Sequence, residues 1–72
     1  MNEIIDAINS ALASGMNPAT AIRVAFNYTL DELAVTSGLA ISELVHLEAG
    51  NVDAEKLARL ASALGLPDGT VS

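Results

Sequence analysis

Few side chains in this 72-residue chain could carry out chemistry, and their spacing does not assemble a reactive centre. The single histidine, His46, cannot build a zinc site or a catalytic triad by itself. The absence of cysteine excludes disulfides, thiol catalysis and cysteine-based metal sites. The sequence also lacks a nucleophile–base pair, a glycine-rich phosphate loop and a ligand cluster at metal spacing. We therefore expect no enzymatic activity, no metal and no cofactor.

The charge balance argues against a free-standing nucleic-acid binder. Nine acidic residues against three basic ones give a formal net charge of −6, whereas phosphate neutralisation by cations supplies most of the affinity for nucleic acids. Phe26 and Tyr28 are the only aromatic residues, too few for a base-stacking platform. A hydrophobic content of 51% excludes a disordered tail. No apolar run approaches the roughly 18 residues that span a bilayer, and no signal peptide is evident, so we expect a soluble cytoplasmic protein.

Turn and cap residues divide the chain into five short helical segments. Asn2 is a candidate N-cap of the first segment, which ends near Gly15. Asn17-Pro18 opens the second, because proline at the first helical position costs no hydrogen bond, and Asn27 is expected to end it in a left-handed conformation. The apolar stripe of the first segment consists of Ile4, Ile5, Ile8 and Leu12. We expect this stripe to pack on the rest of the domain; a dimer seam is the alternative.

The third and fourth segments have the lengths of a helix-turn-helix. Thr29 and Glu32 match the capping-box pattern and predict a helix from about Thr29 to Ser37. Gly38 predicts a tight turn, and a fourth helix is expected over about Ala40 to Ala49.

The remaining turn and cap residues predict the last helix and the division of the chain. Asp53 is the expected cap of a fifth helix that ends at Gly65. We interpret residues 1–16 as an additional N-terminal helix, residues 17–67 as the helix-turn-helix domain and residues 68–72 as a frayed tail.

The stretch from Ile22 to Leu66 resembles the Cro/C1-type helix-turn-helix family. The matching residues are Ile22-Arg23, Thr29-Leu30-Asp31-Glu32-Leu33-Ala34, Gly38-Leu39, Ser42, Leu44, Leu47-Glu48, Gly50, Leu57-Ala58-Arg59-Leu60-Ala61 and Ala63-Leu64-Gly65-Leu66. The resemblance implies an all-α fold, a compact lambda-repressor-like bundle of five short helices. It also implies a structural ion pair between Arg23 and Glu48, which would tie the second helix to the end of the fourth.

The segment that would read DNA in such a family departs from the usual pattern. Base edges present hydrogen-bond donors and acceptors, and only Ser42 and His46 could meet them. Ile41 and Val45 cannot, and Glu43 would repel phosphates. The positions in question hold Ala40, Ile41, Ser42, Glu43, Val45 and His46.

Two positions outside this segment also carry apolar residues where the family commonly has polar or basic ones. The family commonly has a polar phosphate contact where Leu30 stands and a basic residue where Phe26 stands. No Lys or Arg occurs between Arg23 and Lys56. Lys56 and Arg59 could touch phosphate, but we favour a solvated helix face for them. His46 is interpreted as a helical histidine without a special role.

We therefore predict a small transcription-associated regulator that binds another protein, of the antiactivator, antirepressor or antitoxin kind. Its partner would be a transcription regulator, with DNA binding weak or absent, no membrane association, and a homodimer as an option. The predicted partner-binding residues are Phe26, Leu30, Ile41, Glu43 and Val45, and we expect at least one of the four apolar ones to lie in the core. The alternative is a sequence-specific Cro/C1-type repressor that acts as a dimer and contacts DNA through Ser42 and His46.

Overall fold

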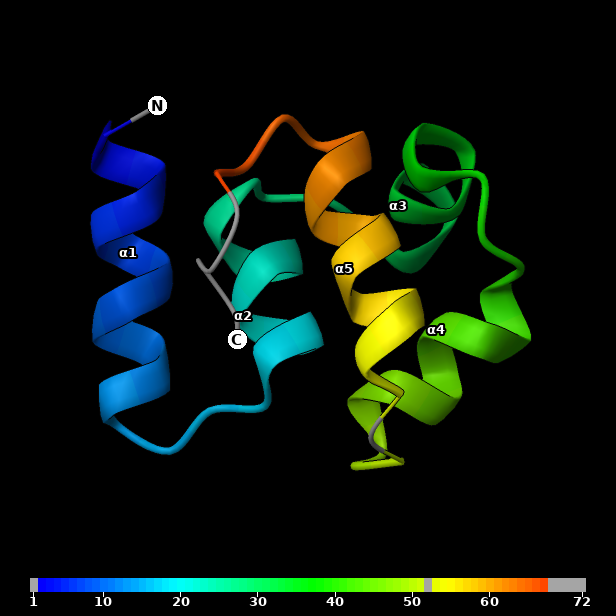
Figure 1. The fold of residues 1–72 in the computed structure, drawn as a ribbon, viewed down its shortest axis with the longest axis horizontal. Coiled ribbons are helices and arrows are strands. Elements are labelled where there is room, and N and C mark those ends of the chain that lie inside the picture. The colour runs from blue at the N-terminus through cyan, green and yellow to red at the C-terminus, as the bar shows by residue number, and fades with distance from the viewer. Residues whose placement is uncertain (1, 52, 68–72) are drawn as a thin grey trace.

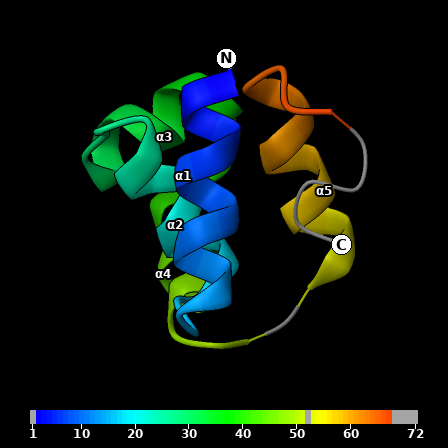
Figure 2. The same ribbon diagram turned by 90° about the vertical axis from the view of Figure 1, so that its left-hand side faces the viewer.

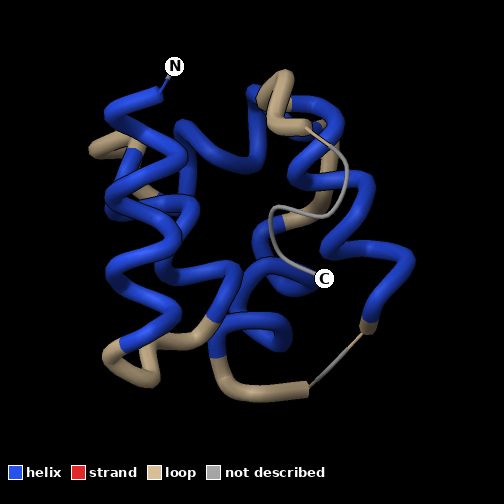
Figure 3. The backbone as a smooth tube through the Cα atoms, turned by 60° about the vertical axis from the view of Figure 1, so that its left-hand side comes forward, coloured by secondary structure: helices blue, strands red, loops and turns tan. Residues whose placement is uncertain are grey.

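The computed structural model describes residues 2–51 and 53–67, and these residues form an all-helical bundle without strands (Figures 1 and 3). The helices are α1 (Asn2–Ala13), α2 (Pro18–Ala25), α3 (Leu30–Ser37), α4 (Ile41–Glu48) and α5 (Ala54–Ala63). The predicted frayed tail, residues 68–72, lies outside the described residues.

Local signals in the sequence set the ends of α2. The Asn17 side chain accepts hydrogen bonds from the amides of Ala19 and Thr20, at 2.9 and 3.2 Å, and so caps the helix that Pro18 begins. After the last turn, Asn27 takes φ = +59°, as the sequence predicted. This left-handed residue lets the Tyr28 amide donate to the Arg23 carbonyl at 3.0 Å, which satisfies an end carbonyl of the helix.

The predicted capping box of α3 is present. The Glu32 amide donates to the Thr29 hydroxyl at 3.1 Å, and the Thr29 amide donates to the Glu32 carboxylate at 2.9 Å. At the other end of α3, Gly38 adopts φ = +76° and its amide donates to the Ala34 carbonyl. The buried Ser37 hydroxyl accepts from the Leu39 amide at 3.2 Å, which satisfies this donor within the turn toward α4. These contacts orient α4 relative to α3.

The core lies between α2, α3, α4 and α5, and α1 extends it on one side. Helix α1 packs mainly against α2 and crosses in front of it when the bundle is viewed from that side (Figures 1 and 2). Ile8 is fully buried and belongs to the same core cluster as Ile22 and Leu60. The other members of its stripe are partly buried against this cluster: Ile4, Ile5 and Leu12. The α1 stripe therefore packs on its own domain, as we expected, and is not left open as a dimer seam.

Candidate functional site

The outer face of α4 carries an exposed apolar pair beside an exposed polar pair. Ile41 and Val45 are each 45% exposed and stand four residues apart, so they are neighbours on one side of the helix. Ser42 and His46 are exposed with the same spacing. None of these four side chains is a lysine, an arginine or an acid. We call Ile41, Ser42, Val45 and His46 the α4 face.

Glu43, the acid expected to attract a partner, is engaged within the domain. One carboxylate oxygen accepts from the Ala40 amide at 3.0 Å at the start of α4, where the Ala40 side chain has no polar atom to cap the helix. The other oxygen lies 3.1 Å from the Lys56 ammonium. The Ala40 hydrogen bond, and after it Lys56, lowers the pKa of the Glu43 carboxyl below its ordinary value of 4.5. The carboxylate therefore stays charged, and the Lys56 ammonium offsets part of its charge locally.

Lys56 therefore has a structural partner rather than a fully solvated position. Its ammonium joins α5 to α4 through Glu43 and also lies 3.9 Å from the Asp53 carboxylate. Arg59, one turn further along α5, is exposed and lies near enough to Glu43 to favour its charged form. The solvated face expected for these two residues is found for Arg59; the Lys56 side chain is also 40% exposed and in addition pairs with Glu43, which the sequence does not show because it does not reveal that α5 begins near the start of α4.

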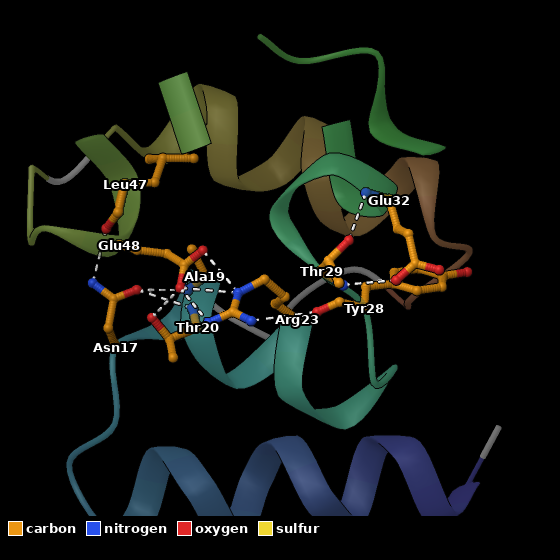
Figure 4. A network of polar contacts seen from close by, with 9 residues as sticks. All are labelled: Asn17, Ala19, Thr20, Arg23, Tyr28, Thr29, Glu32, Leu47 and Glu48. Carbon is orange, nitrogen blue, oxygen red and sulfur yellow. Dashed lines mark hydrogen bonds and ion pairs between the residues drawn. The ribbon is translucent and has the colours of Figure 1, made fainter. Parts of the chain in front are cut away.

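A network of polar contacts holds the other end of α4 against α2 (Figure 4). The Arg23 guanidinium donates to both carboxylate oxygens of Glu48, with the closest contact at 3.0 Å from Nε. The Thr20 hydroxyl donates to the same carboxylate at 2.8 Å, and the Asn17 amide group donates to the Leu47 carbonyl at 2.8 Å. The ion pair that the resemblance implied is present. Sequence reasoning missed the Thr20 hydroxyl as a further donor to Glu48 and the separate hydrogen bond from Asn17 to Leu47.

Two of the predicted partner-binding residues are not freely exposed. Phe26 and Leu30 are partly buried and pack against the core, in keeping with the expectation that at least one of the four apolar side chains lies inward. The physical reason at Phe26 is the left-handed turn at Asn27, which brings the Tyr28 ring back onto the Phe26 ring at a centroid distance of 5.7 Å. The apolar part of the candidate site therefore reduces to Ile41 and Val45.

Two further kinds of feature are absent from the described residues. Within residues 2–51 and 53–67, no group of three or more histidine, cysteine or acidic side chains could hold a metal ion. None of the described helices is long and apolar enough to cross a membrane.

Comparison with known proteins gives one match. A family model described as helix-turn-helix, of the Cro/C1 type, matches residues 21–69, which is more than half of the chain. This is a family of regulatory DNA-binding domains rather than of enzymes. Searches of curated proteins and of solved structures gave no match. The matched range includes α3, the turn at Gly38 and α4, and it leaves α1 outside.

Proposed function

Because the chain belongs to the Cro/C1-type helix-turn-helix family, we propose that it is a transcription regulator that uses the α4 face to bind another protein. The partner would be a transcription activator or repressor whose DNA-binding or dimerising surface is covered, as for an antiactivator, an antirepressor or an antitoxin.

The observation that carries this proposal is that acids of the domain already pair with two of the three cations that could serve the α4 face. Of the three basic residues of the chain, Arg23 is bonded to Glu48 and Lys56 to Glu43, which leaves Arg59. A DNA-reading helix depends on phosphate contacts from cations at its flanks. Here two of the three cations of the chain are already paired with acids of the domain. The exposed part of α4 offers apolar surface in their place.

The apolar pair can supply a measurable part of the affinity. Complete burial of an isoleucine or valine side chain contributes about 1.5–3 kcal/mol, so covering the exposed 45% of each contributes about 1 kcal/mol. The two together contribute about 2 kcal/mol, or about 30-fold in Kd. The net charge of −6 would add long-range attraction for a basic partner such as a DNA-binding surface.

The test is capture of the partner from the native cell with the wild-type chain and with Ile41→Asp and Val45→Asp. Both side chains are half exposed, so both variants should remain folded, which circular dichroism checks. The matched control is Val24→Asp, because Val24 is 53% exposed and lies on α2. We expect both α4 variants to lose the partner while Val24→Asp retains it. Retention of the partner by folded Ile41→Asp and Val45→Asp would show that the α4 face is not the binding surface.

The alternative, a dimeric DNA-binding repressor, has the exposure of Ser42 and His46 in its favour. Both side chains could reach base edges from the α4 face. A gel-shift assay at low salt with DNA from the promoter region of the protein's own gene separates the two functions.

A further inference from the structure

A second exposed surface lies on the outer side of α3. Tyr28, Asp31, Glu32, Val35 and Thr36 line a shallow hollow with a volume of about 320 Å³, which we call the α3 hollow. Val35 is 85% exposed, the highest value among the large hydrophobic side chains of the described residues. It follows Asp31 by four residues and Glu32 by three, so all three side chains are neighbours on the helix surface.

The helix itself explains the acids of the α3 hollow but not its exposed apolar residue, Val35. Asp31 and Glu32 lie in the first turn of α3, where negative charge is favourable, and Glu32 also completes the capping box. Val35 has no such reason, because a β-branched residue at an exposed helical position is less favourable than alanine, glutamate or lysine. The Tyr28 ring, stacked on Phe26, provides a second apolar surface that is held in place.

The charges of the α3 hollow are available to a partner. Among the described residues, no lysine or arginine forms an ion pair with Asp31 or Glu32, since the acids paired in this way are Glu43, Glu48 and Asp53. Asp31 and Glu32 are both exposed. Glu32 uses Oε1 for the Thr29 amide, so its second oxygen can accept from a donor outside the chain. The Glu32 and Tyr28 side chains are drawn as sticks in Figure 4.

We propose that the α3 hollow docks a segment of a partner protein that presents an apolar side chain flanked by lysine or arginine. The apolar side chain covers Val35 and the edge of the Tyr28 ring. The flanking cations meet Asp31 and Glu32, and a cation above the Tyr28 ring gains further attraction. This surface shares no residue with the α4 face, so the inference does not rest on the function proposed above.

The test is a titration of isotope-labelled protein with a short amphipathic peptide of lysine and leucine, followed by amide chemical shifts at low salt. We expect saturable shifts centred on residues 28–36. The double variant Asp31→Asn with Glu32→Gln keeps the capping acceptor of α3 and should weaken binding about tenfold. The matched control is Asp6→Asn with Glu55→Gln, which removes two exposed acids from α1 and α5 and gives the same net charge. It should stay within about twofold of wild type.

Three results would overturn the inference. Equal loss in the two double variants would mean that the peptide responds only to net charge. Shifts centred on α4 would place the peptide on the α4 face. No saturable shift at millimolar peptide would mean that the hollow does not bind such a segment. The variant Ile41→Asp is expected to leave peptide binding unchanged, so failure of the α4 proposal and failure of this one are distinguishable.

Discussion

Replacing Glu48 with alanine should destabilise the domain more than removal of an exposed charge does. The Glu48 side chain is 15% exposed and accepts hydrogen bonds from Thr20 and from the Arg23 guanidinium, which is itself 28% exposed. Removing the carboxylate therefore leaves a partly buried cation and a hydroxyl without these acceptors.

The expected loss in the free energy of unfolding lies between the values for exposed and for buried ion pairs. Breaking a fully buried pair costs about 3–5 kcal/mol, and an exposed pair contributes about 0–1 kcal/mol. Because water can reach part of Arg23, we expect about 2–3 kcal/mol for Glu48→Ala. In a domain of this size that corresponds to a fall in Tm of about 10–20 °C. Glu48→Gln keeps an acceptor oxygen and should cost about half as much.

Urea denaturation followed by circular dichroism measures this difference. The matched control is Glu55→Ala, which replaces an exposed helical glutamate in α5 and changes the net charge equally. We expect it to stay within about 0.5 kcal/mol of wild type. If Glu48→Ala and Glu55→Ala have equal free energies of unfolding, the network between α2 and α4 does not stabilise the fold and our reasoning is refuted.

Three further predictions concern stability. Ile8→Ala should lower the free energy of unfolding by about 2–5 kcal/mol, because Ile8 is fully buried. A loss below about 1 kcal/mol in thermal unfolding would contradict the packing of α1 on the core. Because residue 27 has φ = +59°, Asn27→Ala should lower the free energy of unfolding by about 1 kcal/mol, while Asn27→Gly should leave it nearly unchanged. Equal stabilities of the two variants would count against a left-handed residue there. For Glu43, the lowered pKa means that its charged form stabilises the fold above pH 4.5 and that this contribution is lost as the pH falls through the lowered value. The stability gap between wild type and Glu43→Gln should therefore shrink on acidification, and a gap that grows would contradict the contacts with Ala40 and Lys56.

The helices were predictable because their ends depend on neighbouring residues. Asn17-Pro18, the Thr29–Glu32 capping box and the left-handed Asn27 act within a few positions of the chain, and all are found where expected. The Arg23–Glu48 pair came from the family resemblance, since no local rule joins residues 25 positions apart.

Contacts between helices were the part that the sequence did not reveal. Lys56 meets Glu43 only because α5 passes next to the start of α4, and nothing near either residue in the chain indicates that crossing. The family's usual pattern placed Phe26 and Leu30 on the candidate surface but could not say which of the four apolar residues lies inward; the turn at Asn27 and contacts with the core cover part of both. Ile41 and Val45 are exposed as expected, because none of the described helices covers their side of α4.

The measurement that tests the central claim most directly is the salt dependence of DNA binding by the purified protein. Labelled promoter DNA of its own gene is titrated at about 50 and 200 mM salt and followed by fluorescence anisotropy. With Arg23 and Lys56 paired to acids, Arg59 is the cation left to contact phosphate, so log K should change with log salt by a slope near −1 per chain. We predict this shallow slope and an affinity no better than micromolar. Nanomolar binding with a slope of about −5 or steeper would contradict the account and identify the α4 face as a DNA-reading surface.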